Sequence, residues 1–161
     1  MLADDDAVLV IDETGFFKQG KASCGVTRQY TGSAGKIINC QIGVFICYIS
    51  QHGHAFIERA LYLPKAWTVD SIRMSAAHVP EETDFATKPT LAATTIERPP
   101  SAKVPFGWVA ADTVYGVCAI ETVLRRAGKG YVLRGQFRPQ QSGPGARRRP
   151  LRAMLEQSRK A

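Results

Sequence analysis

Two aspartates in this sequence stand where they could hold metal ions. Asp12 follows the apolar run 7–11, and Asp112 follows the apolar run 104–111. If both runs are strands of one sheet, two carboxylates converge at its edge. Such carboxylates bind hard divalent cations, and two cations can clamp the attacking and leaving oxygens of a phosphoryl transfer. An aspartate after a strand is also a common turn or helix-capping residue, so position alone leaves both interpretations open.

The apolar patterns predict the elements that would place these aspartates. Short runs rich in β-branched and aromatic residues predict strands at 7–11, 37–50, 55–63, 104–111 and 130–133. The turn at 51–54 contains Gly53 and predicts an antiparallel hairpin. Helices are expected from Pro89, which suits a first turn, to about residue 97, and from about 117 to 127. Residues 14–35 are rich in Gly, Lys, Gln and Ser and predict an exposed loop.

This order of elements, β-β-β-α-β-α-β, predicts an α/β fold with a mixed sheet. It is the order of the ribonuclease-H-like fold, in which the first and fourth strands are parallel neighbours. Asp12 and Asp112 would then lie at the same edge of the sheet, although about 100 residues separate them in the chain.

The basic character of the chain is confined to its last part. The net charge is +7, but residues 1–124 carry 10 Lys/Arg against 13 Asp/Glu, and residues 125–161 carry 11 against one. Residues 134–150 consist mainly of Arg, Gly, Pro and Gln, a composition that cannot bury a core. We therefore expect a domain at 1–133 and a disordered basic tail at 134–161. The tail either binds DNA non-specifically or is the product of a reading-frame shift near residue 134.

Several other classes of protein and site are disfavoured. No run approaches the roughly 18 apolar residues of a membrane span, and the N-terminus is acidic, so we expect a cytoplasmic protein without a membrane partner. Cys24, Cys40, Cys47 and Cys118 form no CxxC pair and are expected to be buried free thiols.

Longer motifs around the two aspartates carry a family resemblance. Residues 8–20 (VLVIDETGFFKQG) and 108–116 (WVAADTVYG) resemble the first- and second-aspartate motifs of bacterial insertion-sequence transposases in the DDE superfamily endonuclease group, of the type numbered seven-oh-one. Segments 24–36, 39–44 and 60–67 are similar to further family segments, in the same order. The resemblance extends over residues 6–133.

This resemblance implies a ribonuclease-H-like catalytic core that cleaves and joins DNA strands at transposon ends. It implies Mg²⁺ or Mn²⁺ as cofactor, with Asp12 and Asp112 as the first two catalytic, metal-binding acids. It also implies double-stranded DNA as partner, both the transposon ends and the target, and a homo-oligomer in the full-length family. The expected location is then the bacterial cytoplasm, in association with the nucleoid.

The sequence also departs from the family. Members are longer at both ends, and the third acid is expected beyond residue 133, where the resemblance stops. Glu156 is the only acid after Glu121, and its surroundings match no third-acid motif. We therefore expect a C-terminally incomplete core, inactive as it stands, with one sheet face left uncovered and prone to aggregation. The alternative is a non-catalytic remnant that at most binds DNA through its tail.

Other polar residues are weaker candidates. Four cations of the predicted loop could contact DNA phosphates beside the aspartates, or could be plain solvated side chains: Lys18, Lys21, Arg28 and Lys36. Residues 32–36 lack the spacing of a phosphate-binding loop. Glu13 should point to the opposite face from Asp12 and so share no metal with it. His52 and His54 are expected to be exposed turn residues, and Tyr62 and Trp67 to be core aromatics.

Overall fold

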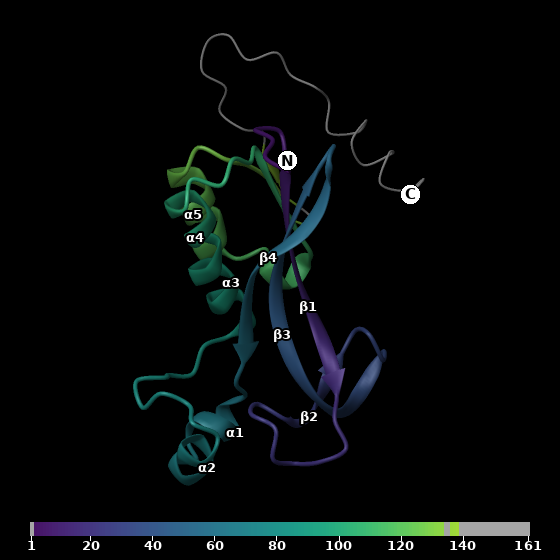
Figure 1. Ribbon diagram of the computed structural model, residues 1–161, viewed down its shortest axis with the longest axis vertical. Coiled ribbons are helices and arrows are strands. Elements are labelled where there is room, and N and C mark those ends of the chain that lie inside the picture. The colour runs from purple at the N-terminus through teal and green to yellow at the C-terminus, as the bar shows by residue number, and fades with distance from the viewer. Residues whose placement is uncertain (1, 134–135, 139–161) are drawn as a thin grey trace.

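A mixed β-sheet forms the centre of the molecule in the computed structural model, which describes residues 2–133 and 136–138 (Figure 1). Its strand order is β2-β3-β1-β5-β6-β7, with β4 paired to β3. The pairs β1–β5 and β5–β6 are parallel, and the others are antiparallel. The strands are β1 Val8–Phe17, β2 Thr27–Thr31, β3 Lys36–Ser50, β4 Gly53–Tyr62, β5 Trp108–Ala111, β6 Gly130–Leu133 and β7 Gln136–Arg138. The predicted α/β class with a mixed sheet is confirmed, and β2 and β7 are additional strands.

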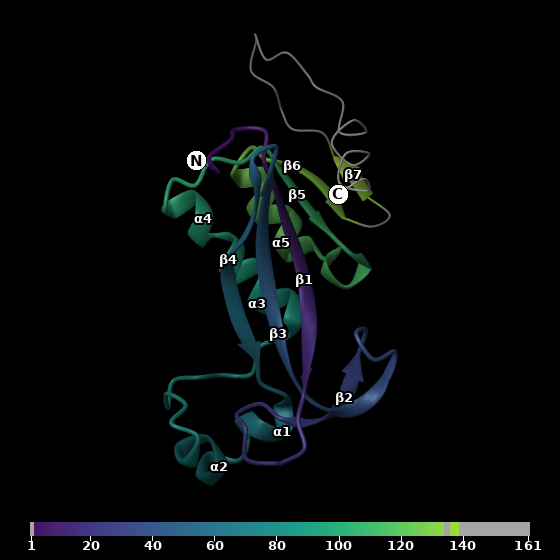
Figure 2. The same cartoon turned by 45° about the vertical axis from the view of Figure 1, so that its right-hand side comes forward.

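Two helices cover one face of this sheet. They are α3 (Lys88–Ile96) and α5 (Cys118–Arg126), which lie on the same side of the strands in Figures 1 and 2. Leu9 and Ile11 of β1 are buried on that face, and Ile120 and Leu124 of α5 join them in the main core. The predicted helices at 89–97 and 117–127 are thus confirmed within a residue at each end. The remaining helices are short: α1 Lys65–Thr68, α2 Ser71–Ala76, α4 Arg98–Ser101 and the 3₁₀ turn η1 Thr113–Tyr115.

The parallel pairing of the two aspartate-bearing strands is as predicted. Val8 to Ile11 of β1 lie opposite Trp108 to Ala111 of β5. The prediction that the first strand ends at Asp12 is wrong, because β1 continues to Phe17. The long strand β3 pairs with the whole of β1, from Val8 opposite Ile49 to Phe17 opposite Cys40. This pairing supplies the hydrogen bonds that hold residues 12–17 extended.

The prediction of one exposed loop at 14–35 is also wrong. It contains the end of β1 and the strand β2, which pairs with β3 from Thr27–Cys40 to Thr31–Lys36. The β2–β3 hairpin curls over β1 at Gly15, where an added Cβ would lie 2.2 Å from Thr31 Oγ1. The remaining loop, residues 18–26, is held by the Asn39 side-chain amide, which donates to the carbonyls of Lys18 (2.7 Å) and Gly20 (2.9 Å).

A second, smaller core lies at the end of the molecule remote from α5, the lower end in Figure 2. We name this part, residues 18–35 and 63–79, the distal lobe. Trp67 of α1 is completely buried there, as predicted for a core aromatic, and its Nε1 donates to the Val26 carbonyl at 2.8 Å. The Arg73 guanidinium of α2 lies 3.7 Å from the centre of the Trp67 ring. The lobe therefore has its own packing contacts apart from those of the main core.

Several remaining expectations concern the thiols, the membrane and the C-terminal tail. All four cysteines are free; Cys40 is buried, but Cys118 is exposed, so its predicted burial is wrong.

Among residues 2–133 and 136–138, no helix is long and apolar enough to cross a membrane. Within the segment predicted to be disordered, Gln136–Arg138 pairs with β6. The rest of 134–161 lies outside the described residues.

Candidate metal centre

Asp12 and Asp112 directly follow the last residue pair of the parallel β1–β5 ladder. That pair is Ile11 opposite Ala111, so the next residue of each segment is an aspartate. Asp12 belongs to β1 and lies opposite Phe45 of β3. Asp112 lies where β5 passes into η1 and caps that turn. The structure therefore brings the two aspartates together, as the sequence predicts, with one carboxylate on a strand and the other at a strand-to-helix junction.

Backbone amides orient both carboxylates. Asp12 Oδ1 accepts a hydrogen bond from the Glu13 N–H, and Asp112 Oδ1 accepts one from the Val114 N–H, each at 2.8 Å. Both residues are exposed to solvent. Each carboxylate thus has one oxygen fixed by the chain while the residue stays open to a ligand from solvent.

The electrostatics of Asp12 favour a bound cation. Partial burial raises the pKa of the Asp12 carboxyl, the negative charges of Glu13 and Asp112 raise it further, and the hydrogen bond from the Glu13 amide lowers it. Keeping Asp12 charged therefore costs the metal-free protein some free energy, which is a common property of functional carboxylates. A divalent cation between Asp12 and Asp112 would remove the repulsion between them.

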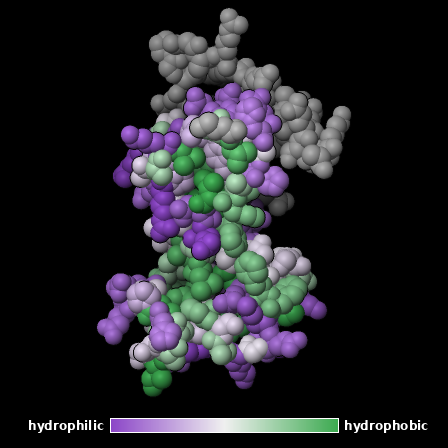
Figure 3. Space-filling model, viewed as in Figure 1, coloured by the Kyte–Doolittle hydropathy of each residue, from purple (hydrophilic) through white to green (hydrophobic). Residues whose placement is uncertain are grey.

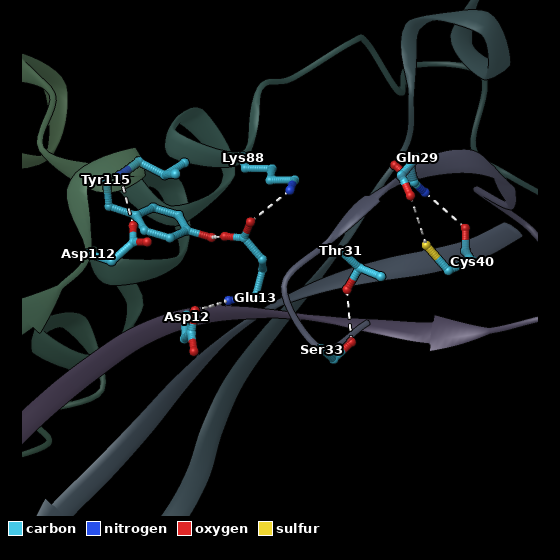
Figure 4. Close-up of polar contacts among 10 residues, drawn as sticks. Asp12, Glu13, Gln29, Thr31, Ser33, Cys40, Lys88, Asp112 and Tyr115 are labelled. Atoms are coloured by element: carbon cyan, nitrogen blue, oxygen red, sulfur yellow. Dashed lines mark hydrogen bonds and ion pairs between the residues drawn. The ribbon is translucent and has the colours of Figure 1, made fainter. Parts of the chain in front are cut away.

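Glu13 points away from Asp12 and belongs to a different set of contacts (Figure 4). Its Oε1 accepts from Lys88 Nζ at 2.7 Å, and its Oε2 accepts a hydrogen bond from the Tyr115 hydroxyl. Tyr115 is completely buried, and burial followed by the hydrogen bond to Glu13 raises the pKa of its hydroxyl. Glu13 is thus engaged by other protein groups, and its side chain points to the opposite side of β1 from Asp12, as predicted.

Lys88 and Tyr115 were not among the residues singled out from the sequence. Tyr115 lies inside the second-aspartate motif, and Lys88 directly precedes Pro89 at the start of α3. Neither position shows a spacing that relates it to Glu13, since the three residues are brought together by tertiary packing alone.

The pair of aspartates fits a hard cation but does not complete a site by itself. In the part of the chain that the structure describes, no group of three His, Cys, Asp or Glu residues is placed to bind one metal. Glu121 is buried in α5 and bonded to Arg125 Nη2 at 2.8 Å, so it is not available. Glu156 lies outside the described residues.

The four predicted DNA-contacting cations lie apart from the aspartates. Lys18 and Lys21 are in the loop after β1, Arg28 is on β2, and Lys36 begins β3. Lys18 comes six positions after Asp12, just past the end of the extended strand β1, which corresponds to a distance of about 20 Å at roughly 3.3 Å per residue. Lys21, Arg28 and Lys36 are exposed on the distal lobe and at the start of β3. His52 and His54 are exposed beside Gly53 at the tip of the β3–β4 hairpin.

Comparison with known families agrees with this geometry. The model of the DDE superfamily endonuclease family matches residues 1–149. The chain belongs to this family. Membership implies DNA as the substrate and divalent metal ions as the cofactor, and the mixed sheet with its parallel β1–β5 pair is consistent with the ribonuclease-H-like fold of DDE enzymes. No curated protein and no solved structure matches the chain.

Proposed function

We propose that this DDE superfamily endonuclease is the catalytic core of an insertion-sequence transposase, one that cleaves and joins DNA strands at transposon ends. The observation that carries the proposal is the position of Asp12 and Asp112, side by side just beyond the parallel β1–β5 ladder. Both aspartates belong to the motifs through which the sequence resembles such transposases.

In this proposal Asp12 and Asp112 hold Mg²⁺ or Mn²⁺. Carboxylate oxygens are the ligands that these hard cations prefer. The bound ions would supply the activation of the attacking oxygen and the neutralisation of the leaving one. The chain's own part is to hold the two carboxylates charged and oriented, through the backbone bonds from Glu13 and Val114.

DNA would reach the aspartates while a flanking stretch of duplex lies along the distal lobe. Lys18, Lys21 and Arg28 of the lobe, with Lys36 at the adjoining start of β3, are suited to phosphate contacts with that duplex. A separation of about 20 Å from Asp12 corresponds to about six base pairs, since duplex DNA rises 3.4 Å per pair. The four cations would therefore anchor the flanking duplex rather than the phosphate that is cleaved.

A nicking assay on supercoiled plasmid with Mn²⁺ tests the proposal. The sequence alone predicts an inactive core, but the family match continues to residue 149, past the point where the resemblance was expected to stop. We therefore expect the 161-residue chain to nick the plasmid, and Asp12→Asn and Asp112→Asn to reduce nicking to the level of a protein-free reaction. Both substitutions keep the size of the side chain and remove its charge. Asp84→Asn, which changes an exposed aspartate of the loop before α3, is the matched control and should nick as the unsubstituted protein does.

Equal nicking by the unsubstituted protein and both aspartate variants would overturn the proposal. If the protein then still bound duplex DNA, the non-catalytic DNA-binding alternative would be favoured. The insertion-sequence type is tested separately, by searching the DNA that flanks the coding region for terminal inverted repeats.

A further inference from the structure

We infer that Glu13, Lys88 and Tyr115 form a positioning network that fixes Asp112 against Asp12 and thereby sets the metal affinity of the pair. None of the three is proposed to touch metal or DNA. The inference rests on the proposed function, because it assigns these residues a role in the same metal centre.

The need for such a network follows from where the ladder stops. Backbone pairing joins β1 and β5 only as far as Ile11 and Ala111. Asp12 and Asp112 come next and carry like charges, which repel each other. Holding them close enough to share a cation therefore requires a further attachment between the two segments, beyond the last ladder pair.

The Glu13–Tyr115 hydrogen bond is that attachment. Glu13 is the residue after Asp12, and Tyr115 ends the short η1 turn that Asp112 caps. Val114 and Gly116 amides bond within the same turn, to Asp112 Oδ1 and the Thr113 carbonyl. A shift of η1 would therefore carry Asp112 with it, and the bond to Glu13 opposes such a shift.

Burial makes this attachment rigid. Tyr115 is completely buried within the main core, so its hydroxyl has a fixed location. The Glu13 and Lys88 side chains keep only 20% and 21% of their exposure, and a charge-assisted bond in such partial shelter is stronger than one at an open surface. Lys88 starts α3, so the same carboxylate also joins the helical layer to β1.

Lys88 also gives the network a distinctive electrostatic signature. It neutralises Glu13, which would otherwise add a negative charge next to Asp12. By charge alone, removal of Lys88 should strengthen cation binding at the aspartates. By loss of positioning, the same removal should weaken it, because Glu13 would no longer be held in place. The direction of the change therefore separates the two effects.

The experiment measures Mn²⁺ affinity in the 161-residue chain by water-proton relaxation, together with amide hydrogen exchange of residues 112–116 in the metal-free protein. Tyr115→Phe removes the hydroxyl without changing charge, and Lys88→Met removes the cation at a half-buried position. Glu58→Gln is the matched control, because it breaks the Glu58–Arg98 ion pair (2.9 Å) between β4 and α4, which involves none of the three network residues.

We expect Mn²⁺ binding about tenfold weaker in Tyr115→Phe, the size of effect usual for outer contacts of metal sites, and weaker binding in Lys88→Met as well. Residues 112–116 should exchange faster in both variants. Glu58→Gln should change neither measurement. Lys88→Met alters a side chain outside the packed core, so it can still test the inference if Tyr115→Phe folds poorly.

The possible failures are distinguishable. If Mn²⁺ binds the unsubstituted protein in a manner that depends on Asp12, but Tyr115→Phe and Lys88→Met bind it equally well or more tightly, the positioning network is overturned and the proposed function stands. If the unsubstituted protein has no Asp12-dependent Mn²⁺ site, the proposed function is overturned, and this inference with it.

Discussion

The Asp12 carboxylate illustrates a conflict between folding and function at a single residue. Its partial burial and the neighbouring charges of Glu13 and Asp112 raise its pKa, so the charged form that would bind metal is also the form that the fold disfavours. Functional sites often carry such a cost in stability. The conflict should be visible in the pH dependence of unfolding.

Asp12→Asn should make the metal-free protein slightly more stable at neutral pH. A carboxyl with a raised pKa in the folded state binds its proton more tightly there than in the unfolded chain. Stability of the unsubstituted protein therefore falls as pH rises from the unfolded-state pKa, about 3.9, through the folded-state value, and the variant escapes this loss. Urea unfolding of both proteins from pH 3 to pH 8 measures the difference.

The difference in stability should vanish near pH 3, where the Asp12 carboxyl is protonated in both the folded and the unfolded protein. Saturating Mn²⁺ should reverse the order at neutral pH, because only the unsubstituted protein gains binding energy. A variant that is less stable at pH 7 without metal would contradict the electrostatic account of Asp12.

Positions that depend on local sequence pattern could be predicted from the sequence, whereas those that depend on tertiary packing could not. Asp12 and Asp112 each follow an apolar run, so their convergence could be expected once the runs were placed in one sheet. The orientation of Glu13 followed from the alternation of side chains along a strand. Its bonds to Lys88 and Tyr115 join residues 75 and 102 positions away, and no local spacing indicates such contacts.

At the level of elements, the curled β2–β3 hairpin restricts the size of the side chain that β1 can accommodate at position 15. The hairpin crosses β1 there, and Ser33 Oγ donates to the Gly15 carbonyl at 3.4 Å. Thr31, at the end of β2, is nearly completely buried beside the glycine. The close approach of the two segments leaves no room for a side chain at this position.

Gly15→Ala should destabilise the protein by about 1–3 kcal/mol, the usual cost of overpacking. The new Cβ would lie 2.2 Å from Thr31 Oγ1 and 2.6 Å from Thr31 Cβ, so the hairpin must move. Gly20→Ala is the control, because an added Cβ there meets nothing within 4 Å. Chemical denaturation measures both, and equal stabilities of the two variants would show that the hairpin does not press on β1.

Two exposed cations, Arg28 of the distal lobe and Lys36 at the start of β3, lead to a prediction about salt dependence. If Arg28 and Lys36 each neutralise one phosphate, Arg28→Gln and Lys36→Gln should each reduce the slope of log affinity against log salt by about one. Lys65→Gln, at the exposed start of α1, tests whether any cation of the lobe has the same effect. Titration of a fluorescent duplex at several salt concentrations measures the slopes, and unchanged slopes would exclude the phosphate contacts.

The element β2 was missed for a physical reason. Residues 14–35 are rich in glycine and polar side chains, which is typical of loops, and their extended conformation comes from pairing with a partner strand. The long apolar strand β3 extends as far as Lys36 and so has backbone groups to pair with both β1 and β2. Pairing with β3 therefore imposes the extended conformation of β2. In β5, β6 and the part of β1 up to Ile11, the apolar runs themselves indicated a strand.

On the scale of the whole molecule, the two faces of the sheet differ in what covers them. The helices α3 and α5 cover the face of Leu9 and Ile11, while the face of Asp12 carries an aromatic strip formed by Phe16, Phe45 and Phe56. The Phe45 ring lies 6.0 Å from that of Phe16 and 5.5 Å from that of Phe56. Figure 3 shows apolar residues at the surface over the lower half of the molecule, where β2 and the ends of β1 and β3 run.

This aromatic strip should make the purified protein self-associate, and Phe56→Thr should reduce that association. Phe56 is 73% exposed, so its removal takes away apolar surface at little cost in packing; the loss of the ring pair with Phe45 should cost no more than about 0.5–1.5 kcal/mol. Threonine is well suited to a strand. Sedimentation velocity over a range of protein concentrations measures the association.

Ile72→Thr provides the control for a general effect of surface hydrophobicity. Ile72 is 84% exposed but lies on α2 in the distal lobe, away from the aromatic strip. If the strip drives association, Phe56→Thr should shift the protein toward the monomer and Ile72→Thr should not. An equal shift in both variants would show that exposed apolar area as such is responsible. No shift in either variant would overturn the prediction, because neither exposed side chain would then contribute to contacts between molecules.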